Sequence, residues 1–188
     1  CSIQRRHQKV LEEAPSPAVT PLIRAAMGEA AVQAAQSVDY EGVGTVEFLL
    51  SSRGEFFFLE MNTRLQVEHP ITELTTGIDL VQKQFEVAAG IKLAIQQDEV
   101  GLFGHAIEAR IYAEDASKGF LPAIGKLAMW RPPLTPGVRF DSGFREGDEV
   151  TVDFDPMLAK LIVHAPSRKA ALRRLDTALS DFVALGVT

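Results

Sequence analysis

Patterns of apolar and polar residues along the chain predict several strands. Two short apolar runs, 45–50 and 56–61, flank the turn-forming segment Ser51-Ser52-Arg53-Gly54, and this order predicts a β-hairpin. Residues 104–112 alternate between apolar and polar side chains, which predicts a strand with one buried face. Weaker signals for strands or extended segments cover 1–10, 138–140, 149–154 and 158–163.

Three further segments carry helix signals. Thr20-Pro21 offers a hydroxyl N-cap followed by proline in the first turn, and predicts a helix over the alanine-rich segment 22–37. Residues 79–89 predict a second helix that ends at Gly90. A last amphipathic helix is predicted from an N-cap at Ser167 to a stop at Gly186. Its predicted apolar face holds Leu172, Leu175, Leu179 and Phe182.

Composition narrows the class of protein. The 188 residues are 46% hydrophobic and 23% charged, which is typical of a globular chain and excludes a disordered or fibrous one. A single cysteine excludes an internal disulfide framework and indicates a reducing compartment. The net charge of −6 argues against general nucleic-acid binding. No apolar run approaches the roughly 18–20 residues of a membrane span. We therefore expect no nucleic-acid partner and no membrane partner.

Two carboxylates fall on one face of the predicted hairpin. A connecting loop of two or four residues places Glu47 and Glu60 directly or diagonally opposite each other. Such close negative charges repel, and a divalent cation would resolve the conflict. Asn62 keeps the same face and adds an uncharged oxygen, a set that favours Mg²⁺ or Mn²⁺ over zinc. The alternative is the exposed face of an edge hairpin.

A second polar group follows the hairpin. Arg64, Gln66 and Glu68 alternate with apolar residues, so an extended stretch would project all three side chains to one side. An arginine, an amide and a carboxylate can together hold a small anion and take a proton from it. The alternative is a solvated edge strand.

Several motifs resemble one enzyme family. Phe58–Leu65, FLEMNTRL, resembles the metal-and-phosphate motif of the ATP-grasp ligases, and Arg64–Pro70, RLQVEHP, narrows the resemblance to the biotin carboxylases. Cys1–Lys9 resembles a second motif of that family, while Gly104–Asp115 and Asp155–Leu161 resemble motifs of its C-terminal domain. The resemblance implies a biotin carboxylase subunit or domain of an acetyl-CoA, propionyl-CoA or methylcrotonyl-CoA carboxylase-type enzyme.

The resemblance also implies a domain organisation. The expected fold class is α+β: the C-terminal part of an ATP-grasp fold, an antiparallel sheet with helices, and then the biotin carboxylase C-terminal domain. Residues 1–90 would be an incomplete ATP-grasp portion, 91–103 a connector and 104–188 the C-terminal domain. The sequence holds no glycine-rich phosphate loop and no Ala-Met-Lys-Met biotin attachment site. We therefore expect a fragment, roughly the C-terminal half of the enzyme, that is inactive alone and carries no biotin of its own.

The implied reaction is the first half-reaction of a biotin-dependent carboxylase, with a role in fatty acid metabolism. ATP and bicarbonate would form carboxyphosphate, which carboxylates biotin on a carrier protein. By resemblance, Glu47, Glu60 and Asn62 match the metal positions. The ions that they bind would bridge the ATP phosphates, so the two glutamates would also contribute to ATP binding.

The remaining implied site residues bind the other reactants. Arg64, Gln66, the Val67 backbone and Glu68 match the bicarbonate pocket, with Arg64 and Glu68 in catalytic positions. Glu68 matches the general base, and Lys9 matches a cation beside bicarbonate and the γ-phosphate. Arg110 matches the residue that stabilises the negative ureido oxygen of biotin. Gln4 and His7 match positions that line the nucleotide and biotin cleft; the alternative for His7 is a surface histidine bonded to backbone.

The implied partners are ATP, bicarbonate, a biotinylated carrier domain and a carboxyltransferase component. A homodimer through the C-terminal domain is also expected, in the cytoplasm or, in a eukaryote, the mitochondrial matrix. Two alternatives stay open. One is another ATP-grasp ligase, such as a carbamoyl phosphate synthase relative. The other is a non-catalytic assembly or dimerisation module.

Overall fold

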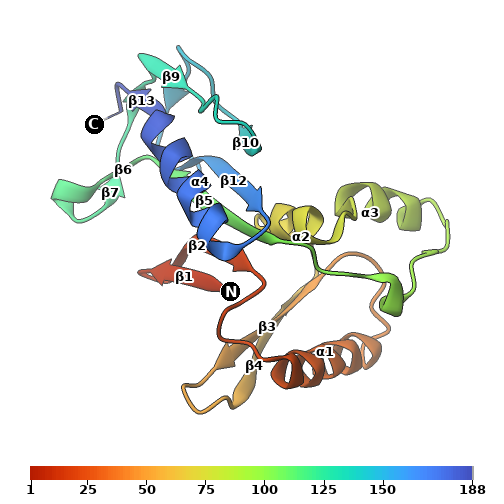
Figure 1. Cartoon of the computed structure of the whole chain (residues 1–188). Helices are drawn as coiled ribbons and strands as arrows, with labels where there is room; N and C mark the ends of the chain where they lie inside the picture. The colour runs from red at the N-terminus through yellow and green to blue at the C-terminus, as the bar shows by residue number, and fades with distance from the viewer. Residues whose placement is uncertain (188) are drawn as a thin grey trace. The chain divides into compact units, whose positions relative to one another are not determined.

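The computed structural model describes residues 1–187 and divides the chain into two compact units (Figure 1). Unit 1 combines Cys1–Ala14 with the chain from Phe103 on, and unit 2 is Pro15–Leu102. The second break lies inside the predicted connector, 91–103. The first fourteen residues, however, fold with the C-terminal part of the chain. The predicted domain bounds follow from the family resemblance, and they stay a prediction.

Unit 1 is built on a five-stranded antiparallel sheet. Its strand order is β1-β2-β5-β12-β10, so the long strand β5 lies at the centre (Figure 1). The strands are β1 Ser2–Arg5, β2 Gln8–Ala14, β5 His105–Tyr112, β12 Met157–Ala165 and β10 Val138–Ser142. The antiparallel sheet agrees with the expected α+β class.

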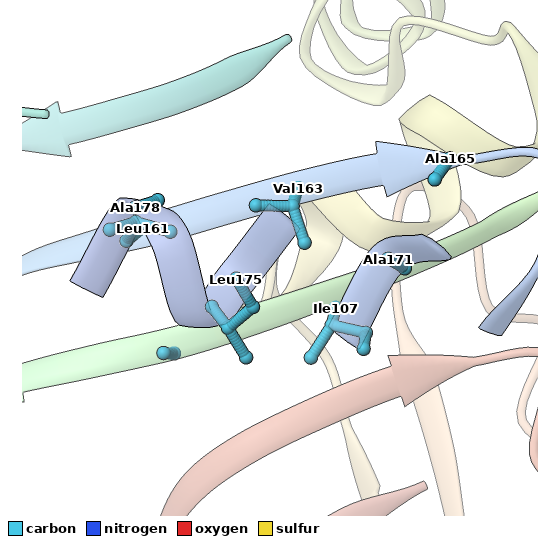
Figure 2. Close-up of a cluster of buried hydrophobic side chains, with 8 residues drawn as sticks. Ile107, Leu161, Val163, Ala165, Ala171, Leu175 and Ala178 are labelled. Carbon is cyan, nitrogen blue, oxygen red and sulfur yellow. The ribbon is translucent and has the colours of Figure 1, made fainter. Parts of the chain in front are cut away.

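Helix α4, Arg168–Asp181, covers one face of this sheet. The side chain of Ser167 caps it by accepting a hydrogen bond from the Ala170 backbone N–H, as predicted. Small residues on its buried face let the helix approach the strands closely (Figure 2). The core joins Ile107, Ala109, Leu161, Val163 and Ala165 of the sheet to Ala171, Leu175 and Ala178 of the helix.

The predicted final helix is wrong in two details. It ends at Asp181 instead of near Gly186, and the short strand β13, Val183–Leu185, follows. Leu172 and Leu179 are exposed, because the face turned to the sheet is the one that carries Leu175 and the alanines. Small side chains thus decide which stripe of the helix is buried.

A second core lies beside the first in unit 1. Trp130 packs against the rings of Phe140 and Phe182 at centroid distances of 6.0 and 5.1 Å. The described part of unit 1 also contains three pairs of short antiparallel strands. They are β6 Glu114–Asp115 with β7 Leu121–Pro122, β8 Gly125–Lys126 with β11 Glu149–Val150, and β9 Met129–Arg131 with β13.

Replacing Leu161 with alanine should destabilise unit 1 by about 2–5 kcal/mol, because the side chain is fully buried and its loss leaves a cavity under α4. Trp130 is the single tryptophan of the chain, so its fluorescence during urea unfolding reports on this unit. The matched control is Leu134→Ala, because Leu134 is 91% exposed and the change should stay within about 0.5 kcal/mol. Equal effects of the two variants would contradict this core.

The expectation that the strand at 104–112 has one buried face is wrong. His105, Ile107 and Ala109 face the α4 core, but Glu108 on the other face is also fully buried. The register explains this burial, because Glu12 on β2 and Ile162 on β12 flank Glu108 on both sides. The polar face of β5 is therefore part of the interior.

An ion-pair network ties β2 to β5 and α4. The Glu13 carboxylate lies 2.7 Å from His105 Nε2 and accepts hydrogen bonds from Arg168, the nearer from Nε at 2.7 Å. Burial alone would raise the pKa of Glu13, but the hydrogen bonds from Arg168 and His105 outweigh burial and lower it. Glu13 thus anchors strand β2 to helix α4.

Unit 2 holds a hairpin and three α-helices. The elements are α1 Pro21–Gln36, β3 Thr45–Leu50, β4 Phe56–Asn62, α2 His69–Thr76, α3 Leu80–Ala88 and a 3₁₀ turn, Gln97–Glu99. The Thr20 hydroxyl caps α1 as predicted, and the hairpin and α3 are confirmed. The short helix α2 was not predicted, because threonines and an early proline give it a weak helix pattern. Within residues 1–187, no helix is long and apolar enough to cross a bilayer.

Candidate active site

The hairpin of unit 2 brings the three predicted metal-binding side chains together. Glu47 on β3 pairs directly with Glu60 on β4, and Asn62 follows two residues later on the same face. Asn62 Nδ2 donates hydrogen bonds to Glu47 Oε1 at 3.2 Å and to Glu60 Oε1 at 3.0 Å. The prediction that these side chains share one face is confirmed, and their metal role stays a prediction.

A one-residue bulge produces this alignment. The turn is Ser51–Glu55, five residues instead of the two or four expected, and the register pairs Phe48 with Phe58. The next pair is Glu47 with Glu60, so Leu59 is the extra residue. Without the bulge Glu47 would lie opposite Leu59, and Glu60 would point to the other face of the hairpin.

The chemistry of this cluster fits a hard divalent cation. Two carboxylates and an amide offer oxygen ligands, and rotating the Asn62 amide would turn its Oδ1 toward an ion between the glutamates. Among residues 1–187 no three His, Cys, Asp or Glu side chains gather as a metal cage. A small set of protein ligands is typical of Mg²⁺, which usually completes its shell with water and substrate phosphates.

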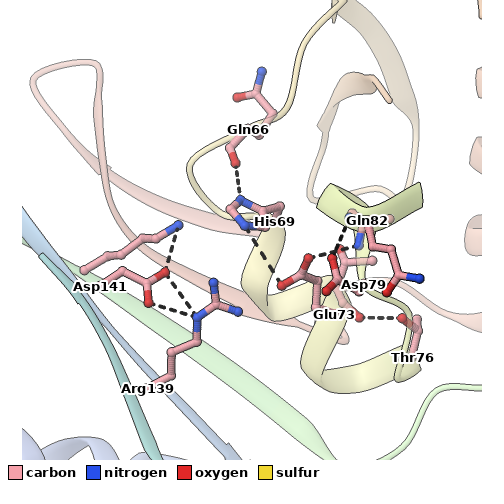
Figure 3. A network of polar contacts seen from close by, with 11 residues as sticks. Gln66, His69, Glu73, Thr76, Asp79, Gln82, Arg139 and Asp141 are labelled. Carbon is pink, nitrogen blue, oxygen red and sulfur yellow. Dashed lines mark hydrogen bonds and ion pairs between the residues drawn. The ribbon is translucent and has the colours of Figure 1, made fainter. Parts of the chain in front are cut away.

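The segment after the hairpin differs from the extended stretch that the sequence predicted. Strand β4 ends at Asn62, and the chain bends and then turns into α2. Figure 3 shows the Gln66 carbonyl oxygen against the His69 ring, with Nδ1 at 2.8 Å, and the His69 backbone N–H also donates to that oxygen. The helix start therefore fixes the Gln66 backbone.

The amide of Gln66 is an orphaned buried group. Its side chain is 8% exposed, and within residues 1–187 Nε2 has no hydrogen-bond partner. A buried donor without a partner costs free energy, so such a group is often reserved for a ligand. An acceptor such as a carboxylate-like anion would satisfy it.

The other predicted anion-binding residues surround the start of α2. Glu68 is the N-cap residue of α2, but its side chain does not cap the helix. Val67 and Glu68 are half-buried, whereas Arg64 is exposed and donates to the Leu65 carbonyl oxygen at 3.1 Å. The positive end of the α2 dipole lies at Glu68, which favours an anion beside it.

The remaining predicted residues lie in unit 1, on the β1–β2 hairpin and on β5. Gln4 pairs with Lys9, whereas Ile3 pairs with Leu11, so Val10 is an extra residue in β2. Leu11 packs toward the α4 core, and Glu12 therefore points to the opposite face. The bulge at Val10 brings Lys9 back to that same face.

The tip of this hairpin is strained and firmly held. Arg6 and His7 adopt left-handed φ values of 49° and 66°, which are unusual for non-glycine residues. Arg5 pairs with Glu114 and lies 3.8 Å from the centroid of the Phe120 ring, while Arg6 donates to the Gly119 carbonyl oxygen. Both arginines therefore bind other residues of unit 1. His7 is exposed at the tip.

Arg110 on β5 is oriented by residues that the sequence did not single out. Its Nη2 donates to Glu12 Oε1 at 2.6 Å, and its guanidinium lies within hydrogen-bonding reach of the Tyr112 side chain. The Tyr112 hydroxyl donates to the Lys9 carbonyl oxygen at 3.2 Å. A largely buried strand arginine requires a carboxylate partner. The local sequence pattern did not show that Arg110 is buried, so nothing in it singled out Glu12.

A cavity of about 330 Å³ lies elsewhere in unit 2. It is lined mostly by apolar side chains of α3 and of the segment that follows it, among them Leu80, Val87, Leu93 and Ile95. None of the predicted site residues lines it. The predicted site residues therefore form two groups, one in each unit.

Comparisons with known proteins match both parts of the chain. Residues 1–96 match the family described as carbamoyl-phosphate synthase L chain, ATP binding domain. Residues 108–188 match the family described as biotin carboxylase C-terminal domain. The chain belongs to the biotin carboxylase family. The recognition made from the motifs is confirmed.

Curated biotin carboxylase relatives align with the whole chain. Methylcrotonoyl-CoA carboxylase subunit alpha, mitochondrial, of Rattus norvegicus is 52% identical over 188 residues, which are 100% of this chain and 26% of that protein. Biotin carboxylase 1, chloroplastic, of Populus trichocarpa is 54% identical over 187 residues, 100% of this chain and 35% of that protein. The chain thus spans well under half the length of these relatives.

Solved biotin carboxylase structures share the fold. The biotin carboxylase domain dimer of Hydrogenobacter thermophilus 2-oxoglutarate carboxylase, in complex with MgADP, ADP and bicarbonate, has a TM-score of 0.96 at 44% identity. The biotin carboxylase subunit of pyruvate carboxylase has a TM-score of 0.95 at 44% identity. Each match covers 100% of this chain and 42% of the other chain. The expected fold class is confirmed.

Proposed function

We propose that the protein containing this chain uses ATP and bicarbonate to carboxylate biotin held on a carrier domain. The observation that carries the proposal is the convergence of Glu47, Glu60 and Asn62 on one face of the β3–β4 hairpin. The chain turns from this cluster directly into the segment that buries the unpartnered Gln66 amide. A cation site and an anion site thus follow each other within a few residues.

The hairpin would hold the phosphate end of ATP. Glu47, Glu60 and Asn62 would bind Mg²⁺ or Mn²⁺, which when bound neutralises phosphate charge as the phosphoryl group moves. The bulge at Leu59 keeps both carboxylates on one face of the hairpin. Both would therefore reach the same ion, instead of pointing to opposite faces.

The segment before α2 would bind bicarbonate. The Gln66 amide would donate to the anion, and exposed Arg64 is able to add a charged donor. The Val67 backbone N–H and the start of α2 would add further positive potential. Glu68, which leaves the helix cap unused, would accept the bicarbonate proton as general base.

Unit 1 would supply the groups that face biotin and the transferred phosphate. Lys9 would place a cation beside bicarbonate and the γ-phosphate, and Arg110 would stabilise the negative ureido oxygen of biotin. Gln4, opposite Lys9, and His7 at the hairpin tip would line the nucleotide and biotin cleft. The paired strands β2 and β5 hold Lys9 and Arg110 on one sheet face.

The test is an assay of the full-length protein with Mg²⁺-ATP, labelled bicarbonate and free biotin. We expect release of ADP that requires bicarbonate, and incorporation of label into biotin. The description of residues 1–96 favours carbamoyl phosphate synthesis as the second candidate. Ammonia-dependent carbamoyl phosphate formation without labelled biotin would therefore overturn the proposal, as would a preparation that folds and associates but cleaves no ATP.

The wider setting is proposed on the same basis. The partners would be a biotinylated carrier domain, a carboxyltransferase component and a second copy of the chain bound through the C-terminal domain. The Hydrogenobacter thermophilus relative is described as a domain dimer. The proposed location is the cytoplasm, or the mitochondrial matrix in a eukaryote; the named relatives are mitochondrial in rat and chloroplastic in poplar.

A further inference from the structure

A polar network on one face of the unit 1 sheet surrounds Arg110. Glu12 on β2 is buried, with 1% of its surface exposed, and receives the Arg110 Nη2 hydrogen bond at 2.6 Å. The Arg110 side chain is 11% exposed, so this is an ion pair largely removed from water. An arginine held at short distance by a buried carboxylate has few rotamers open to it.

The same face links Arg110 to Lys9 through Tyr112. The Tyr112 hydroxyl donates to the Lys9 carbonyl oxygen at 3.2 Å, and the Arg110 guanidinium lies within hydrogen-bonding reach of the Tyr112 side chain. Burial raises the pKa of Tyr112, so the phenol stays protonated and able to donate at neutral pH. One hydroxyl thus connects the backbone of one predicted catalytic residue to the side chain of another.

We propose that Glu12 and Tyr112 are positioning residues for biotin carboxylation, acting through Arg110. Glu12 fixes the direction of the guanidinium. Tyr112 fixes the distance between the β2 backbone at Lys9 and the β5 side chains. The inference rests on the proposed function, because Arg110 and Lys9 take their roles from it.

Glu12→Gln in the full-length protein should lower biotin carboxylation about tenfold, because a charge-assisted hydrogen bond becomes a neutral one. Bicarbonate-dependent ATP cleavage without biotin should fall by less than about threefold. The readout is the ratio of the two rates. A residue that only supports the fold would lower both rates together and leave the ratio unchanged.

The matched control is Glu13→Gln. Glu13 is the next residue of the same strand and also binds an arginine, Arg168, but through the α4 side of the unit. This variant should lower stability and leave the ratio of the two rates unchanged. If Glu13→Gln changes the ratio as much as Glu12→Gln does, positioning by Glu12 is overturned.

Two further variants test the proposal if the Glu12→Gln variant, altered at a buried position, folds poorly. Tyr112→Phe keeps the ring but removes the hydroxyl. It should lower the same ratio about two- to tenfold, which corresponds to the net free energy of one neutral hydrogen bond. Combining Glu12→Gln with Arg110→Ala should lower the ratio no further than Arg110→Ala alone, since Glu12 acts through Arg110. Additive losses, or an unchanged ratio in Tyr112→Phe, would overturn the inference.

The two proposals fail in different ways. An unmodified protein that carboxylates no biotin would overturn the proposed function, and this inference with it. An unmodified protein that carboxylates biotin, combined with an unchanged ratio in the variants, would overturn the positioning roles alone.

Discussion

Replacing Glu60 with glutamine in the full-length protein should reduce bicarbonate-dependent ATP cleavage by at least about 100-fold. Glu60 faces Glu47 across the hairpin, and Asn62 bridges the two carboxylates. Glutamine keeps the size of the side chain but removes the charge that would bind the cation. The measurement is ADP release at increasing Mg²⁺. Part of the lost ATP-cleaving activity should be recovered at high metal concentration.

The control for this variant lies on the same hairpin. Glu55→Gln removes one negative charge from the exposed turn between β3 and β4, and it should leave ATP cleavage within about twofold of the unmodified protein. Arg64→Ala should also abolish the bicarbonate-dependent reaction, but without a shift in Mg²⁺ dependence. Near-normal turnover in both Glu60→Gln and Arg64→Ala would refute this assignment of the site.

Replacing Arg110 with alanine should separate the two halves of the chemistry. Carboxylation of biotin should fall by about 100- to 1,000-fold, because the variant loses the cation that would stabilise the ureido oxygen. Bicarbonate-dependent ATP cleavage should fall by less than about tenfold. The measurement compares labelled biotin with ADP release in the same reaction, and equal losses would contradict a biotin-specific role.

Arg110→Ala also removes the partner of a buried carboxylate, so its stability has to be measured alongside. Glu12 loses the 2.6 Å hydrogen bond, and the loss of a charged partner from a buried carboxylate destabilises the fold. Arg110→Lys is the comparison, because lysine keeps a positive charge near Glu12 but lacks the planar fork of donors. Arg110→Lys should recover most of the stability, as measured by Trp130 fluorescence during unfolding. It should recover little of the biotin carboxylation.

Local sequence signals predicted much of the architecture because the elements concerned are locally encoded. The Thr20 cap, the Ser167 cap and the two apolar runs around residues 51–54 each act within a few residues. Helix α2 was missed because its eight residues include Pro70 and three threonines. Its burial, with Ile71 and Thr75 in the interior, depends on contacts that the local pattern does not contain.

Some features of the candidate site were likewise predicted from local sequence, and others were not. Residue types and their spacing placed Glu47, Glu60 and Asn62 on one face, and the structure agrees. The expected extended stretch from Arg64 to Glu68 was wrong, because the turn into α2 replaces the strand after Asn62. Glu12 and Tyr112 were missed because their contacts cross from β2 to β5, about a hundred residues away in sequence. Pairing between distant strands is not visible in a local pattern.

Three strands of the protein each contain one residue more than their partner, at Val10, Leu59 and Leu158. None of these three side chains has a proposed role in the chemistry, yet two of them decide which way Lys9 and Glu60 point. An engineer who copied the reactive residues onto regular strands of another scaffold would lose the site while preserving its composition. For transplantation or redesign, the unit to conserve is therefore the irregular backbone with its one-residue insertions. The exposed side chain of Leu59 can be varied, whereas Leu158 is buried in a core of unit 1.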